Sequence, residues 1–136
     1  MDIELTDHSE EVLEAMREGV TAALEAVGNQ AVSHAKSNIT RAGRVDTGAL
    51  RNSMSHLVQG DTVYVGTNNE YAIYNELGTG IYLEGGGGRQ TPWHYVDAKG
   101  KGHWTHGMKP IHFLKNAVTE HISEYNAIVQ KILRGN

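Results

Sequence analysis

Apolar positions recur every three or four residues near both ends of the chain, a spacing typical of amphipathic helices. The first stripe predicts a long helix over about residues 7–39, with Asp7 as N-cap and Glu10 completing a capping box. We expect this stripe to face the core, although a subunit interface is the alternative. Gly28 could kink or split the helix, because glycine costs about 1 kcal/mol relative to alanine. The stripe comprises Leu13, Met16, Val20, Ala23, Val27 and Ala31.

The second stripe begins after Pro110 and continues to about Leu133, which predicts one C-terminal helix. Its members are Phe113, Leu114, Ala117, Val118, Ile122, Tyr125, Val129 and Ile132.

Residues 38–44 predict a polar loop, and residues 46–51 predict a short helical turn. Gly43 lies in the loop, and Asp46 or Thr47 could cap the turn that ends near Arg51. Alternating apolar residues then predict a hairpin of strands 53–59 and 62–66, with a Gly-Asp turn between them. Val63 and Val65 should share one face of this hairpin.

The second half of the chain alternates short elements with glycine-rich connections. Residues 71–77 predict a short helix that ends at Gly78, and the four glycines at 85–88 predict a flexible stretch. Segments 93–96 and 103–105 flank a Gly- and Lys-rich turn, which predicts a second hairpin with His94 opposite His103 or Thr105.

Together these elements predict an α+β fold with one domain over residues 1–136. It should contain a long N-terminal helix, a small antiparallel sheet with an extended hairpin insertion, and a C-terminal helix packed on the sheet. A flexible loop or hairpin should project at about residues 81–108.

Composition narrows the classes of function. The chain has no Cys, so disulfides and thiolate metal sites are excluded, and a reducing cytoplasm suits it. The net charge of −4 argues against specific nucleic-acid binding. We expect no signal peptide and no membrane partner, since no basic-then-apolar leader or long apolar run is visible.

The sequence contains no strong indication of a catalytic or metal-binding site. His94, His103 and His106 lie close together in sequence, but their spacing matches no common metal motif. Glu76 and Asp46 could suggest acid–base catalysis, yet carboxylates beside turns usually cap backbone groups. We therefore expect no catalytic residue, no metal and no cofactor. The alternatives are a metal-dependent hydrolase that uses the histidines and Glu76, or a host-surface adhesin that uses the tryptophan-bearing loop.

Three ordered blocks of sequence resemble those of the Hong Kong-97 phage gene-product-ten-like family of head–tail joining and tail-completion proteins. A Thr-Gly-x-Leu-x-x-Ser block lies at 47–53, a Tyr-Ala-x-x-x-Glu-x-Gly-Thr block at 71–79, and a Pro-x-x-Phe-Leu-x-x-Ala block at 110–117. The resemblance extends over about residues 5–120. The family-motif positions, taken as structural, are Asp46, Thr47, Gly48, Leu50, Arg51, Ser53, Tyr71, Ala72, Tyr74, Glu76, Gly78, Thr79, Gly80, Pro110, Phe113, Leu114 and Ala117.

The resemblance implies a virion protein of the head–tail junction, assembled in the bacterial cytoplasm by a phage, prophage or phage-derived particle. It would complete the tail or neck as a ring, by analogy a hexamer, although the free subunit should be a monomer or weak oligomer. Its neighbours would be connector, tail-terminator or tail-tube proteins, near the DNA channel. Trp93, Tyr95 and Trp104 are the expected interface anchors. Glu76 should accept hydrogen bonds from backbone groups or from Arg51.

Overall fold

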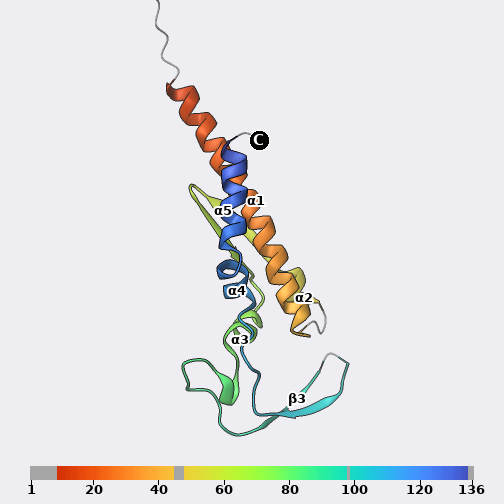
Figure 1. Cartoon of the computed structure of the whole chain (residues 1–136). Coiled ribbons are helices and arrows are strands. Elements are labelled where there is room, and N and C mark those ends of the chain that lie inside the picture. The colour runs from red at the N-terminus through yellow and green to blue at the C-terminus, as the bar shows by residue number, and fades with distance from the viewer. Residues whose placement is uncertain (1–8, 45–47, 98, 135–136) are drawn as a thin grey trace, which may run out of the picture.

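The computed structural model describes residues 9–44, 48–97 and 99–134 of the chain, and confirms an α+β fold. Its longest element is helix α1 (Ser9–Arg41), which is continuous through Gly28 (Figure 1). The predicted break at Gly28 is therefore wrong. A Cβ atom at Gly28 would lie 2.4 Å from Cδ2 of His56, so this glycine makes room for the neighbouring hairpin.

Helix α1 ends two residues later than predicted. Gly43 adopts a left-handed conformation with φ of 72°, and its N–H donates to the carbonyl of Thr40. The N–H of Arg44 donates to the carbonyl of Ile39, which completes a Schellman motif. The proposed caps Asp7, Asp46 and Thr47 lie outside the described residues.

The first hairpin agrees with the sequence pattern. Strands β1 (Ser55–Gln59) and β2 (Thr62–Gly66) pair antiparallel around the predicted turn. Val63 and Val65 are half-buried against the helices, whereas Tyr64 is 56% exposed. Strand β1 begins later than predicted because Ser53 ends helix α2 (Ala49–Asn52), where its hydroxyl donates to the carbonyl of Leu50.

The C-terminal segment forms two helices, so the prediction of one continuous helix is wrong. Helix α4 (Phe113–Thr119) and helix α5 (Ile122–Leu133) are separated by a turn at Glu120 and His121. Both helices pack along α1 (Figure 1). The Tyr125 hydroxyl donates to the Ala117 carbonyl and joins the two helices across the turn.

The core consists of two clusters arranged along α1. One lies where α1, α2 and α4 meet, and it contains Ala35, Ile39, Leu50, Met54, Phe113 and Ala117. The other contains Val27, Ala31 and Tyr125, with Val63, Val65, Ile128 and Val129 packed against it. Since β2 and α5 share the second cluster, the C-terminal helices contact the sheet as well as α1. Among the described residues, no helix combines the length and apolar character needed to cross a membrane.

The remaining elements lie toward one end of the molecule (Figure 1). Helix α3 (Ala72–Leu77) and the 3-10 turn η1 (Gly80–Tyr82) lead into strands β3 (Trp93–Val96) and β4 (Gly102–Thr105), which form the predicted second hairpin. Residues 81–97 and 99–108, here called the arm, extend away from the helices (Figure 1). The register places His94 opposite Trp104, so its predicted pairing with His103 or Thr105 is wrong.

Candidate functional site

The arm is joined to the rest of the described chain, here called the body, where backbone segments cross at a distance that only glycine permits. A Cβ atom at Gly80 would lie 2.0 Å from the carbonyl oxygen of His106, and one at Gly107 would lie 2.1 Å from that of Thr79. A Cβ atom at Gly88 would lie 2.0 Å from the carbonyl oxygen of Gly80. Any side chain at these positions would force the segments apart.

Hydrogen bonds fix this glycine crossing. The N–H of Thr79 donates to the carbonyl of Met108 at 2.9 Å, and the N–H of Met108 donates to Oγ1 of Thr79 at 2.9 Å. The N–H of Ile81 donates to the carbonyl of His106. The base of the arm is thus ordered by backbone pairing and close approach, without a hydrophobic core of its own.

Glu76 ties the second motif block to the third. Its Oε1 accepts a 2.7 Å hydrogen bond from the N–H of Leu114, and its Oε2 lies 3.3 Å from the N–H of Lys115. Nδ1 of His112 lies 3.3 Å from the same Oε2. Glu76 therefore caps the N-terminus of α4, where a negative charge is favoured. The expected backbone hydrogen bonds to Glu76 are confirmed, whereas the alternative partner Arg51 donates to Thr40 instead.

Arg44 makes a second connection between the motif blocks. Its guanidinium donates to Oδ1 of Asn75 at 3.2 Å and to the carbonyl of Lys109 at 2.6 Å. Asn75 is buried and donates in turn to the carbonyl of Tyr71. Burial lowers the pKa of the Arg44 guanidinium, which still remains charged.

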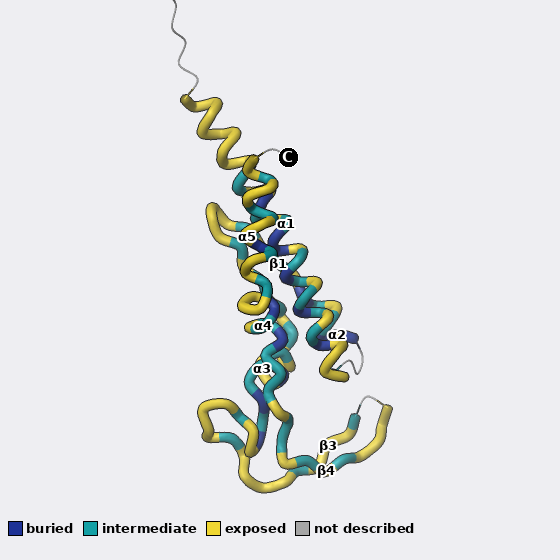
Figure 2. The backbone as a smooth tube through the Cα atoms, viewed as in Figure 1, coloured by how far each residue is buried: buried dark blue, intermediate teal, exposed yellow. Residues whose placement is uncertain are grey.

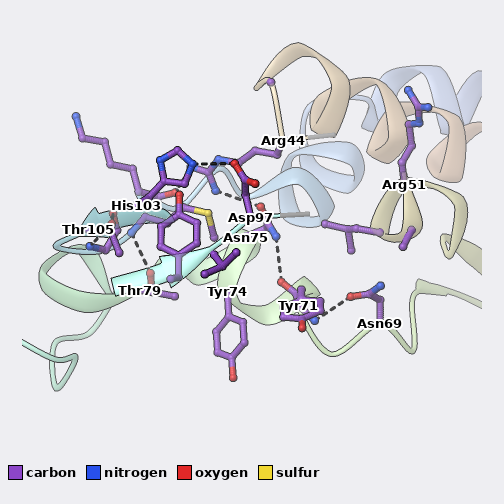
Figure 3. Close-up of a pocket in the computed structure, with 18 of the residues that line it drawn as sticks. Arg44, Arg51, Asn69, Tyr71, Tyr74, Asn75, Thr79, Asp97, His103 and Thr105 are labelled. Atoms are coloured by element: carbon purple, nitrogen blue, oxygen red, sulfur yellow. Dashed lines mark hydrogen bonds and ion pairs between the residues drawn. The ribbon is translucent and has the colours of Figure 1, made fainter. Parts of the chain in front are cut away.

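An open groove of about 1150 Å³ lies between the arm and the body (Figure 3). Tyr71 and Tyr74 border it from the α3 side, Arg51 from α2, and Tyr95 and His103 from the arm. Several aromatic rings beside cationic side chains in one open groove suit a protein segment better than a small polar substrate.

The arm exposes large apolar side chains. Trp104 is 74% exposed, Val96 is 61% exposed and Tyr95 is 45% exposed. Trp93 is half-buried, with the Arg89 guanidinium 5.5 Å from its ring centroid. Because β3 pairs Trp93 and Tyr95 with Thr105 and His103, these two aromatic residues lie on one face and Trp104 on the other.

Asp97 stabilises the tip of the arm. It accepts hydrogen bonds from Nε2 of His103 and from the N–H groups of Lys101 and Lys99. The bond from His103, followed by that from Lys101, lowers the pKa of the Asp97 carboxyl group. The hairpin turn is thereby closed by a charged acceptor.

A second apolar surface lies at the opposite end of the molecule. The first turns of α1 extend beyond α5 and are exposed along their length (Figure 2). Val12, Leu13 and Met16 are 55%, 51% and 60% exposed. The predicted core stripe of α1 is therefore buried only from Ala23 onward, and its members Leu13 and Met16 are exposed.

The residues considered for hydrolysis do not converge. His103 pairs with Asp97, whereas His94 lies on the other face of the hairpin. The carboxylate of Glu76 lies at the start of α4, where its ion-pair partner is His112, which is not one of the three candidate histidines. His103 and Glu76 therefore have separate structural partners.

The sequence pattern did not predict two features of the structure. Arg44 lies in a predicted loop, and nothing local indicated its buried partner Asn75. His34, His121 and Glu124 form the one cluster among the described residues that could hold a metal ion. These residues are far apart in sequence and on different elements, so only the packing of α5 on α1 brings them together.

The described residues thus form an α+β fold with an exposed aromatic arm, a groove at its base and an exposed start of helix α1. Residues 4–78, more than half of the chain, match the model of the family described as "Bacteriophage HK97-gp10, putative tail-component". The chain belongs to this family of phage tail components. Comparisons with curated proteins and with solved structures gave no match.

The matched region extends from α1 to the end of α3. It includes the first motif block and the second as far as Gly78. The arm and helices α4 and α5 lie outside it, so it is shorter than the resemblance seen in the sequence. The contacts of Glu76 and Arg44 connect the matched region to the third block.

Proposed function

We propose that the chain is a structural subunit of the head–tail joint, which completes the tail or neck by assembling into a ring and binding neighbouring connector, tail-terminator or tail-tube proteins. Membership of a tail-component family supports a place in the virion. The observation that carries the proposal further is the arm, which exposes Trp104, Val96 and Tyr95 and shares no residue with either core cluster. Exposed aromatic side chains of this kind are typical anchors of protein interfaces.

The positions of the two apolar surfaces favour a ring. The arm and the first turns of α1 lie at opposite ends of the molecule (Figures 1 and 2). A closed ring of identical subunits requires two different surfaces that contact each other head to tail. We propose that the arm of one subunit binds the exposed α1 surface around Met16 of the next. Six copies would match the symmetry that the family resemblance suggests.

Complementation of a phage that lacks this gene tests the proposal. Trp104→Ala should yield separate heads and tails, because it removes the most exposed aromatic side chain of the arm. The free variant should unfold at the same temperature as the parent, since an exposed side chain contributes little to the monomer. Tyr64→Ala is the matched control, because Tyr64 is 56% exposed on the body hairpin.

The expected result is loss of joined particles with Trp104→Ala and normal joining with Tyr64→Ala. Normal joining with Trp104→Ala would show that the arm does not carry the interaction. A particle that joins normally but fails to adsorb to its host would favour the adhesin instead.

A further inference from the structure

We propose that His34, His121 and Glu124 bind one divalent transition-metal ion of the zinc class, which clamps α1 to the turn between α4 and α5. His34 comes from the C-terminal third of α1, His121 immediately precedes α5, and Glu124 lies in the first turn of α5. Their ligand atoms all lie within 4.8 Å of one another. This site is separate from the arm and from the groove, and it does not depend on the proposed assembly.

The donor set and spacing suit such an ion. Two imidazole nitrogens and one carboxylate oxygen form a common three-residue zinc site, with a fourth position open to water. Ligand atoms of a tetrahedral zinc ion lie about 3.3 Å apart, given metal–ligand distances near 2.0 Å. Oε2 of Glu124 is 3.4 Å from Nδ1 of His121 and 2.8 Å from Nε2 of His34. The second pair needs to separate by only about half an ångström.

The imidazole rings must turn to accept the ion. Their centroids are 3.5 Å apart and their planes differ by 7°, and two parallel planes cannot both contain one metal ion. We expect the ring of His121 to turn, because this residue lies in the turn between α4 and α5 and not within a helix. His34 is held more firmly, by its position on α1 and by Glu124.

The surroundings favour a defined site over a random surface cluster. The side chains of His34, His121 and Glu124 retain 21%, 28% and 38% of their exposure, so each is partly shielded while leaving access for an ion. The ring of Tyr125 lies beside both imidazoles, with centroids 6.2 and 6.3 Å away. Tyr125 also belongs to the core cluster that joins α1 to α5, so a bound ion would reinforce that contact.

Titration of the untagged, metal-free chain with Zn²⁺ and Co²⁺ tests the inference. We expect one bound ion per chain and a thermal unfolding midpoint that rises with metal concentration. Bound Co²⁺ should give the visible absorption bands that are typical of low-symmetry coordination. His121→Ala and Glu124→Gln should each weaken binding at least about tenfold, since even the outer shell of metal sites has effects of 10–100-fold. Glu124→Gln keeps the shape of the side chain, and circular dichroism of this variant checks that any loss of binding occurs in the folded chain.

His94→Ala is the matched control, because His94 is an exposed histidine of the arm. This variant should bind as the parent does. Absence of saturable binding by the parent chain would overturn the inference. Binding that survives both His121→Ala and Glu124→Gln, or that disappears with His94→Ala, would overturn it equally.

Discussion

Replacement of Glu76 by Gln should destabilise the fold by removing the charged cap of α4. The carboxylate accepts from the N–H of Leu114 at 2.7 Å and lies near the N–H of Lys115, and its side chain is only 18% exposed. Loss of a helix cap costs about 0.5–2 kcal/mol, and hydrogen bonds to charged groups contribute about 1.5–3 kcal/mol. Because Gln retains one acceptor oxygen, we expect a loss of about 1–2 kcal/mol.

Thermal and urea unfolding followed by circular dichroism measure this loss. For a chain of this size, the thermal midpoint should fall by about 3–8 °C. Glu70→Gln is the matched control, since Glu70 is an exposed carboxylate that precedes the same helix α3. If Glu76→Gln and Glu70→Gln have equal stability, Glu76 does not cap α4 in solution.

A double-mutant cycle separates the cap from the pairing with Arg51 that the sequence suggested. The structure joins Arg51 to Thr40 instead, so Glu76→Gln and Arg51→Ala should be additive within about 0.5 kcal/mol. A coupling energy above about 1 kcal/mol would place Arg51 beside Glu76 after all.

The glycines and the arm tip give three further predictions. Urea unfolding should show that Gly28→Ala destabilises the chain by about 1–3 kcal/mol, because its new Cβ atom would clash with the hairpin. Gly19→Ala is the control, since a Cβ atom there makes only ordinary van der Waals contact, and it should stabilise the chain by up to about 1 kcal/mol. Gly80→Ala should accelerate hydrogen exchange throughout the arm, whereas Gly85→Ala, with φ of 85° and open space around it, should not. Hydrogen bonds lower the pKa of Asp97 in the folded arm, so they stabilise the hairpin above about pH 4. This stabilisation is lost as the pH falls through the lowered pKa, and tryptophan fluorescence should report the transition. Asp97→Asn should abolish it.

The periodicity of the sequence was sufficient for most of the fold. Both hairpins and helices α1 and α3 have strong local signals, namely turn residues between alternating strands and a glycine at the end of each helix. The break at Glu120 and His121 had no such signal, because the apolar spacing continues from Val118 to Ile122 across the turn. The prediction of a break at Gly28 was wrong because the small residue is needed there for contact with the ring of His56, which belongs to another element.

Residue contacts were harder to predict than elements. The glycine run at 85–88, followed by aromatic residues on both sides of a Gly- and Lys-rich turn, indicated the extended hairpin that the structure contains. The partners of Glu76 and Arg44 depend on which segments cross at the base of the arm, and no local pattern specifies that crossing. His34 and Glu124 meet only after α5 has packed on α1, so their proximity is a product of tertiary structure.

Cryo-electron microscopy of the joined particle tests the central proposal most directly. The expected result is a ring of copies at the head–tail junction, in which Trp104 of each copy contacts α1 of the next near Met16. The purified subunit should meanwhile remain a monomer or weak oligomer. A single copy at the junction, no copy there, or a location at the distal tip of the tail would contradict the proposal.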